Sequence, residues 1–383
     1  MSRVRSESPA RVHQPVPKMR TTGHAMSTEG WAQCLAQESL PSIIEMLQQQ
    51  ENPDERKINL NGQNLNDAQV KKLALLVAHA ECPSFALNLE GAAAPTIGHV
   101  LAGAAAHKPL TQLNLRDFRL VRAEKSTCIS HQHVGLIAKL LAPDSKLQVL
   151  ILDGQKLLPS VMADGQARRP KINDFPHLPH HLNLAMDQQK VFKRMLMAVG
   201  ASKTMKTLSL AGCDLFNEDL GRIGNALFAQ KTRCTLITLE LSNNFGEILH
   251  SADSVFLASH SVRGFLDLAA RARGLESLDL GLSVRRGETF DAELLALVVA
   301  VKTLCHVSPC PDSEADTPLE IRQQLEANRH ARIASAMETV LCAQQHLVPP
   351  ELGDLMAGLI IGVQQAKAAT TADVPRSQSA ELV

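Results

Sequence analysis

The sequence of 383 residues contains no tyrosine, and Trp31 is its only tryptophan. Aromatic residues make up 3% of the chain, so there is little material for a base-stacking platform or a tyrosine-rich binding surface. The chain also lacks an excess of charge of either sign, because Lys plus Arg and Asp plus Glu each total 39. Without a net basic field, a role in binding nucleic acid or an anionic membrane surface is disfavoured.

Long apolar runs and patterned cysteines are missing as well. No apolar run approaches the roughly 18 to 20 residues that span a bilayer, which predicts a soluble protein. The eight cysteines lie far apart with no framework spacing, which indicates free thiols in a reducing compartment. Residues 1–30 are rich in Ser, Pro, Thr and Arg but lack the apolar core of a secretory signal. We therefore predict a disordered arm there, with a cytoplasmic protein or one exported without a cleavable signal.

One short pattern recurs along the chain. The stretch LITLELSNNF, residues 236–245, alternates leucine with polar residues and ends on two asparagines. The last leucine of each L-x-L copy marks eight positions: Leu60, Leu89, Leu115, Leu152, Leu184, Leu210, Leu241 and Leu280. The intervals between them are 29, 26, 37, 32, 26, 31 and 39 residues. These values fit a repeat of about 28 residues into which longer loops are inserted.

Between these predicted strands the apolar period changes from two to 3.6 residues, which is typical of amphipathic helices. Four apolar stripes show it: Val70, Leu73, Ala74 and Val77; Val134, Ile137, Ala138 and Leu141; Leu220, Ile223, Gly224 and Leu227; Leu294, Leu297, Val298 and Val301. Asn66, Ser130 and Asn217 precede three of the stripes as predicted N-caps. Strands that alternate with helices at a fixed period predict an α/β solenoid.

The strand pattern resembles the leucine-rich repeat L-x-x-L-x-L-x-x-N/C-x-L, and the full helix in each unit resembles the ribonuclease-inhibitor-like subclass. The resemblance implies a horseshoe with a parallel concave sheet, outer helices and helical caps at both ends. It also implies that the residue three beyond the last leucine turns inward to satisfy backbone groups. Asn244 and Cys213 occupy that position, and Gln63 and Gln155 are longer substitutes, whereas Phe118 and Ala92 depart from the pattern. The asparagine pair is then a turn and not an active site.

The repeats and their flanks divide the chain into six predicted parts. They are residues 1–30 (disordered arm), 31–54 (helical N-terminal cap), 55–303 (leucine-rich repeats), 304–318 (linker), 319–364 (C-terminal helices) and 365–383 (disordered tail). The caps are expected because a solenoid must cover its terminal repeats.

The concave face is the predicted working surface. In each strand the residue between the last two leucines, and the residue after the last one, point to this face. The candidate partner-binding residues are Asn59, Asn88, Glu90, Asn114, Arg116, Asp153, Asn183, Ser209, Glu240, Ser242 and Asp279. A surface this polar and this poor in aromatics suits a hydrogen-bonding protein interface better than a small-molecule pocket. The alternative is that these are ordinary solvated strand positions.

Three insertions interrupt the short-loop array and are candidate partner contacts, at residues 119–132, 156–180 and 246–263. The second contains His177 and His180, followed by His181, which raises the question of a metal site. Exposed titratable histidines are the preferred interpretation, because no cysteine or patterned carboxylate lies near. The segment CHVSPC, from Cys305, resembles half of a zinc site but has no second half. We therefore predict no metal and no cofactor.

Three further resemblances point to regulators of other enzymes. Cys310–Asp312 matches the Cys-x-Asp of bacterial leucine-rich-repeat ubiquitin ligases, although the remaining chain is much shorter than their catalytic domain. Residues 347–360 resemble the opening of an F-box, which docks a ligase adaptor. Some ribonuclease-inhibitor-like repeats activate GTPases, and Arg116 and Arg119 are the nearest candidates for a catalytic arginine.

The sequence thus favours a non-enzymatic protein–protein interaction scaffold that binds on the concave face. The unstructured Ser-rich leader also resembles those of bacterial type III secreted effectors, which act in a host cell. The alternative is a regulator of a ubiquitin ligase, as an F-box-like adaptor, or of a small GTPase. No Gly-rich phosphate loop, nucleophile elbow or paired-carboxylate motif is present.

Overall fold

The computed structural model describes most of the chain between residues 26 and 343. The described ranges are residues 26–117, 129–155, 157–158, 161–163, 166–168, 179–229, 234–244, 262–272, 274–280, 288–308 and 317–343.

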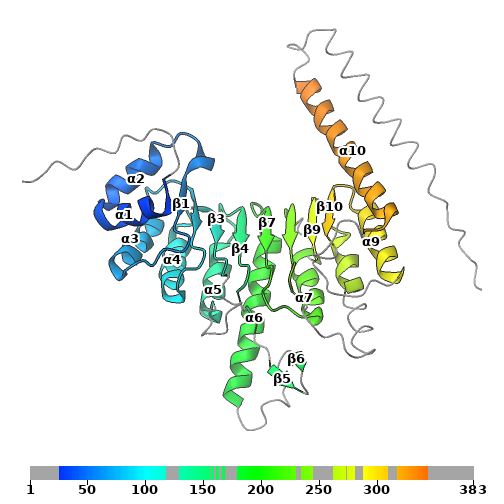
Figure 1. Cartoon of the computed structure of the whole chain (residues 1–383), viewed down its shortest axis with the longest axis horizontal. Helices are drawn as coiled ribbons and strands as arrows, with labels where there is room; N and C mark the ends of the chain where they lie inside the picture. The colour runs from blue at the N-terminus through cyan, green and yellow to red at the C-terminus, as the bar shows by residue number, and fades with distance from the viewer. Residues whose placement is uncertain are drawn as a thin grey trace, which may run out of the picture.

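The fold is α/β, with one open sheet of eight parallel strands (Figure 1). The strands are β1 (Lys57–Asn59), β2 (Phe85–Asn88), β3 (Leu110–Asn114), β4 (Val149–Ile151), β7 (Thr207–Ser209), β8 (Thr238–Glu240), β9 (Ser277–Asp279) and β10 (His306–Ser308). Their order in the sheet is their order in the sequence, apart from the separate antiparallel pair β5 (Val161–Ala163) and β6 (Gln166–Arg168). This order is consistent with a solenoid, in which each unit contacts only its neighbours.

Helices connect the strands, as parallel pairing requires. They are α1 (Thr28–Gln37), α2 (Leu40–Gln48), the 3₁₀ turn η1 (Pro53–Glu55), α3 (Asp67–Ala78), α4 (Ala94–His107), α5 (His131–Leu140), α6 (Pro179–Ala201), α7 (Asn217–Phe228), α9 (Glu288–Ala300) and α10 (Leu319–Ala343). Residues 262–269 are also helical. Helices α3 to α7 pack side by side in chain order, as do α9 and α10. Figure 1 shows this layer running alongside the sheet.

The core lies between the sheet and the helices and consists of two columns of aliphatic side chains. The strand register stacks one column directly: Ile58, Leu87, Leu113, Leu150, Leu208, Leu239, Leu278 and Val307. The second column follows two residues later: Leu60, Leu89, Leu115, Leu152, Leu210, Leu241 and Leu280, each at most 1% exposed. The alternation of buried and half-exposed residues is thus the period-two pattern of a sheet with one covered face.

The predicted helical stripes face this core. Most of their members are buried, and the helix starts follow two of the three predicted N-caps. The Asn66 Oδ1 atom accepts from the Gln69 N–H at 3.0 Å, and the Gln69 side chain accepts from the Asn66 N–H at 2.8 Å, which forms a capping box. Ser130 is the N-cap of α5. The prediction for Asn217 is wrong by one residue: Phe216 is the N-cap of α7, and the buried Asp219 carboxylate accepts from the Phe216 N–H at 3.0 Å.

The N-terminal helices α1 and α2 cover the first repeat unit. Trp31, the only tryptophan of the chain, belongs to α1 and is 2% exposed. The Gln69 Nε2 and Lys72 Nζ atoms of α3 donate to the Ala32 and Glu38 carbonyls, each at 2.8 Å. Helix α1 begins at Thr28, within the segment predicted to be a disordered arm, because the Ser27 hydroxyl accepts from the Gly30 N–H at 3.1 Å.

The strand predicted around Leu184 is wrong, since that residue lies in α6. The L-x-L match there sits in the N-terminal part of a helix of 23 residues. The same helix buries Phe192, Met195, Leu196 and Val199, a 3.6-residue spacing that overrides a three-residue alternation. Strand β7 therefore follows β4 directly in the sheet.

The eighth strand is β10, which pairs with β9 and lies in the segment predicted as a linker. Helix α10 follows it and packs on α9. Its Asn328 side chain is 4% exposed and donates to the carbonyls of Val298, Val301 and Leu304 at 3.0, 3.4 and 2.9 Å. A polar side chain of α10 thus supplies hydrogen bonds to backbone carbonyl groups at and just beyond the C-terminal end of α9. The second C-terminal helix predicted at residues 349–363 lies outside the described residues.

Within the described ranges, no helix is both long enough and apolar enough to cross a membrane. The described cysteines, Cys34, Cys82, Cys213, Cys234 and Cys305, are free thiols. Burial raises the pKa of Cys34 to about 11 and that of Cys82 to about 12, so these two thiols are poor nucleophiles.

Candidate functional site

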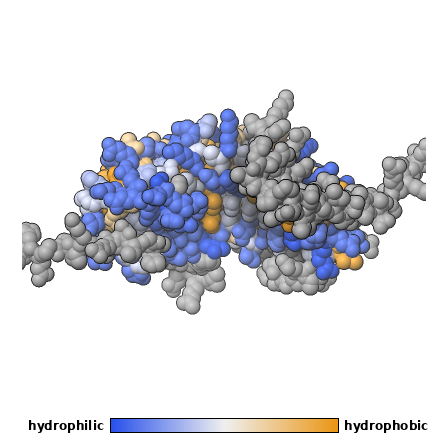
Figure 2. Space-filling view, turned by 90° about the horizontal axis from the view of Figure 1, so that it is seen from above, coloured by the Kyte–Doolittle hydropathy of each residue, from blue (hydrophilic) through white to orange (hydrophobic). Residues whose placement is uncertain are grey.

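The side of the sheet opposite the helices is polar, and we call it the polar face. Its central row consists of the last residue of each strand: Asn59, Asn88, Asn114, Ile151, Ser209, Glu240, Asp279 and Ser308. The row two residues earlier consists of Lys57, Ala86, Gln112, Val149, Thr207, Thr238, Ser277 and His306. In Figure 2 the coloured part of the molecule is mostly hydrophilic, with apolar residues in small separate spots.

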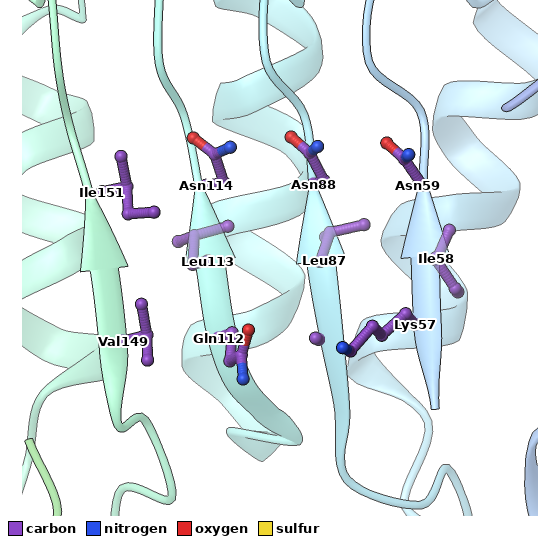
Figure 3. Close-up of a pocket in the computed structure, with 11 residues that line it drawn as sticks. Lys57, Ile58, Asn59, Leu87, Asn88, Gln112, Leu113, Asn114, Val149 and Ile151 are labelled. Carbon is purple, nitrogen blue, oxygen red and sulfur yellow. The ribbon is translucent and has the colours of Figure 1, made fainter. Parts of the chain in front are cut away.

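Three asparagines occupy the same position on β1, β2 and β3 and make the same contact. The Oδ1 atoms of Asn59, Asn88 and Asn114 accept from the backbone N–H two residues later, at 3.2, 3.0 and 3.0 Å. This local bond fixes each amide through its oxygen, which leaves the Nδ2 group directed away from the strand. Figure 3 shows the three amides side by side at one level of the sheet. The Asn114 Nδ2 atom reaches the Glu90 carboxylate at 3.4 Å, a long bond.

These asparagines border a shallow depression of about 230 Å³ over β1 to β4. The residues that line it are Lys57, Ile58, Asn59, Ala86, Leu87, Asn88, Gln112, Leu113, Asn114, Val149 and Ile151. Lys57 is the only charged residue among them. Its side chain and the asparagines lie toward β1, whereas Val149 and Ile151 give the β4 end an apolar surface (Figure 3). The depression therefore combines hydrogen-bond donors at one end with aliphatic surface at the other.

Beyond β4 the polar face is built differently, from side chains that bond across strands. The Ser209 hydroxyl lies 2.5 Å from Asp153 Oδ1 and 2.9 Å from Glu240 Oε2. The Ser242 hydroxyl donates to the other Glu240 oxygen at 3.3 Å, and the Ala211 N–H donates to Asp153 Oδ1 at 3.1 Å. Arg116 pairs with Asp153 at 3.0 Å. One network thus connects the ends of β3, β4, β7 and β8.

Asp153 is the buried centre of this network, with 5% of the residue exposed. Burial raises the pKa of its carboxyl above the usual range, and the Glu240 carboxylate adds to the rise. The Ser209 hydroxyl, the Ala211 N–H and Arg116 act in the opposite direction. A hydroxyl carries one proton but lies within bonding distance of two carboxylates, so a proton on Asp153 satisfies both contacts of Ser209.

A second set of bonds between units lies just after the strands, where side chains turn toward the core. The Asn244 Nδ2 atom donates to the Leu210 and Leu241 carbonyls at 2.7 and 2.8 Å, and its Oδ1 atom accepts from the Leu215 N–H at 3.2 Å. Cys213 and Gln155 reach the equivalent carbonyls one unit back, those of Leu152 and Leu115, at 3.1 and 2.5 Å. The predicted role of these three side chains in satisfying backbone groups is confirmed.

The residue before each of these three positions has a left-handed backbone. Gly154 has φ +72°, Gly212 has φ +61° and Asn243 has φ +55°. Glycine is required at Gly154, because a Cβ atom there would lie 2.1 Å from the Asp117 carbonyl oxygen. Asparagine tolerates this conformation better than most residues, so Asn243 can take the place that glycine has in the other two turns. The two asparagines therefore have different roles. Asn243 makes the turn, and Asn244 satisfies the backbone around it.

The structure brings ten of the eleven predicted partner-binding residues to the polar face or its rim. Asn59, Asn88, Glu90 and Asn114 lie over β1 to β3, and Arg116 and Asp153 form an ion pair at the boundary. Ser209, Glu240, Ser242 and Asp279 lie over β7 to β9. Asn183 is the exception, since it lies in α6 and not in a strand.

Sequence reasoning missed Lys57, Gln112 and Val149, which line the depression. The period of two residues in a strand could have identified them, because they lie two residues before the central row, on the same side of their strands. It also missed the Arg116–Asp153 pair. The two residues belong to units separated by an inserted loop, so no local spacing relates them.

The remaining motifs give no second site in the described part of the chain. His180 and His181 lie in α6, while His177, Cys310 and residues 347–360 lie outside the described residues. Within the described ranges, no three His, Cys, Asp or Glu residues are grouped so as to hold a metal ion. Arg116 is bound to Asp153, and Arg119 lies outside the described residues.

The sequence matches no protein-family model, and no curated protein shows significant similarity to it.

Proposed function

We propose that this chain is a leucine-rich-repeat protein of the ribonuclease-inhibitor-like kind, with a horseshoe shape, and that it binds another protein on the polar face without catalysing a reaction. The observation that carries the proposal is the repeated unit of strand, left-handed turn, inward polar side chain and helix. This unit recurs from β4 to β8 with equivalent contacts to the preceding unit. Solenoids of such units use their extended sheet surface for binding.

The chemistry of the polar face supports a protein partner. Its central row carries amides, hydroxyls and carboxylates, which form hydrogen bonds across a broad contact. The depression over β1 to β4 holds about 230 Å³, below the roughly 300 to 1,000 Å³ usual for a small-molecule site. A shallow surface of this size fits a few side chains of a partner protein better than an enclosed ligand.

Affinity capture from candidate lysates tests the proposal. The bait is the full chain, compared with the double variant Asn114→Arg with Glu240→Arg, which adds bulk and positive charge to both halves of the polar face. Gln189→Arg on α6 is the control, since it adds a charge on the helix layer. We expect a protein that the wild type and the control capture equally and the double variant loses. Equal capture by all three would contradict the proposal.

The place of action is a separate proposal. The Ser-rich leader supports a type III secreted bacterial effector, and most of that leader, residues 1–25, lies outside the described residues. Deletion of residues 1–25 is expected to abolish export through a needle-type secretion system while the melting temperature stays the same. Unchanged export would contradict the effector hypothesis. A ubiquitination or GTP-hydrolysis assay with and without the protein tests the alternative of a ligase or GTPase regulator.

A further inference from the structure

Resting on the proposed function, we infer that the depression over β1 to β4 recognises an extended segment of the partner that carries an acidic side chain and an aliphatic side chain about four residues apart. The acidic group lies at the β1–β2 end, against Lys57, Asn59 and Asn88. The aliphatic group lies on Val149 and Ile151 of β4.

The donor end argues for an acidic group. The Oδ1 atoms of Asn59 and Asn88 are engaged by their own backbones, so the groups they present to a partner are the Nδ2 donors. Gln112 and the ammonium group of Lys57 border the same space. A carboxylate accepts bonds from several donors at once, and bonds to a charged acceptor are about twice as strong as neutral ones.

Glu90 limits where that carboxylate can lie. It follows Asn88 by two residues and accepts from Asn114 at 3.4 Å, so it places a negative charge on the turn side of the asparagine row. Lys57 lies on the opposite side of the row, two residues before Asn59 in the same strand. An acidic side chain of the partner is therefore drawn toward Lys57 and away from Glu90, which fixes the end of the depression that it occupies.

The distance across the sheet sets the spacing in the partner. Neighbouring strands lie about 4.8 Å apart, so β1 and β4 are separated by three intervals, about 14 Å. An extended chain rises about 3.3 to 3.4 Å per residue, so a segment that crosses the strands covers this distance in about four residues. Because the carboxylate lies between β1 and β2, the separation shortens to about 12 Å, for which four residues is the nearest even spacing. An even spacing is required, because successive side chains of an extended segment point to opposite sides and both groups must face the sheet. Either chain direction satisfies this spacing.

The part of the polar face beyond β4 offers a poorer site for the same segment. Ser209 and Asp153 are buried and bonded to each other, and Glu240 is bonded to two hydroxyls. The carboxylates of Glu240 and Asp279 repel an acidic ligand. Charge and available donors therefore both assign the acidic partner segment to β1 to β4.

A random dodecapeptide library displayed on phage, selected on the full-length protein, tests the inference. The variant Asn88→Asp keeps an oxygen that accepts from the Glu90 N–H but replaces the donor with a carboxylate, so the strand end is preserved. Lys57→Glu reverses the charge at the same end. Gln189→Glu on α6 is the matched control for added negative charge. Circular dichroism and melting temperature establish that each variant is folded.

We expect enriched peptides to carry Asp or Glu four residues from Leu, Ile, Val or Met. Synthetic copies should bind at least about tenfold more weakly to Asn88→Asp and to Lys57→Glu, and equally to Gln189→Glu. Basic consensus peptides, peptides that bind Asn88→Asp as tightly as the wild type, or no enriched peptide at all would overturn the inference. Peptides lost only with Glu240→Arg would overturn it too but leave protein binding on the polar face intact.

Discussion

The two halves of the polar face use the same strand positions for different purposes. Over β1 to β3, each asparagine of the central row bonds to the backbone of its own strand, and the turn carbonyls of Leu60 and Leu89 accept from main-chain N–H groups. From β4 onward, side chains bond across strands on both sides of the sheet. Asp153, Ser209 and Glu240 do so on the polar face, and Asn244 does so on the inward side.

Under the proposed function, this difference separates surface that stabilises the stacked units from surface that serves a partner. Asn59 and Asn88 bond to their own strands through Oδ1, which holds their Nδ2 donors in place for a partner. Such preorganisation favours binding. A side chain that joins two units stabilises their interface, and a repeat protein depends on such nearest-neighbour terms. We therefore propose that the C-terminal half is mainly structural and that the N-terminal half serves recognition.

The largest effect should come from a clash at the boundary between the halves. Gly154→Ala places a Cβ atom 2.1 Å from the Asp117 carbonyl oxygen at φ +72°, and we expect a loss of roughly 3 kcal/mol or more in the free energy of unfolding. Gly62 has a similar φ of +69°, but its Cβ position is open, so Gly62→Ala should cost only about 1 kcal/mol. Urea unfolding of the two variants measures the difference. Equal losses would show that the units on either side of Gly154 are not packed this closely.

The inward polar position should give the next largest effect. Asn244→Ala leaves the Leu215 N–H and the Leu210 carbonyl without their buried partner, at an expected cost of about 2 to 3 kcal/mol. Gln63 occupies the same position after β1, but its side chain makes no hydrogen bond among the described residues. We expect Gln63→Ala to change the free energy of unfolding by less than about 0.5 kcal/mol. A cost for Gln63→Ala as large as that for Asn244→Ala, in the same unfolding experiment, would remove the distinction between the halves.

The buried carboxyl of Asp153, at the centre of the C-terminal network, should make the folding stability depend on pH. Because the pKa of Asp153 is raised in the folded protein, folding favours its protonated form. Its contribution to stability is therefore full below the unfolded pKa of about 3.9 and is lost as pH rises through the higher folded value. The stability of the wild type minus that of Asp153→Asn should fall as pH rises from about 4. Thermal melting across this range measures it, and a rising difference would contradict the raised pKa.

Most of the fold could be predicted from the sequence, because leucine spacing encodes it locally. The strand at Leu241, the turn at Asn243 and the inward role of Asn244 follow from a pattern of ten residues. The strand predicted at Leu184 failed because a short alternation cannot outweigh the apolar stripe of a long helix. Strand β10 was missed because its buried residue is Val307 and its segment contains no leucine pair.

The candidate site could be predicted only in part. The strand period places Asn88 and Asn114 on the polar face, but it does not tell that their oxygens bond to their own strands. The strand period also gives Ser209 and Asn88 equivalent positions, although Ser209 is buried in a hydrogen-bond network and Asn88 borders the depression. These differences depend on neighbours from other units, which a single-strand pattern does not contain.

The most direct test measures the affinity of the captured partner for two single variants, Asn114→Arg and Glu240→Arg, by calorimetry. The account predicts that Asn114→Arg weakens binding at least about tenfold with little change in melting temperature. Glu240→Arg should lower the melting temperature, because it removes the acceptor of Ser209 and Ser242, and should leave the affinity of the folded protein within about threefold. The opposite result, with binding lost in Glu240→Arg and kept in Asn114→Arg, would place the partner on the C-terminal half and contradict the account.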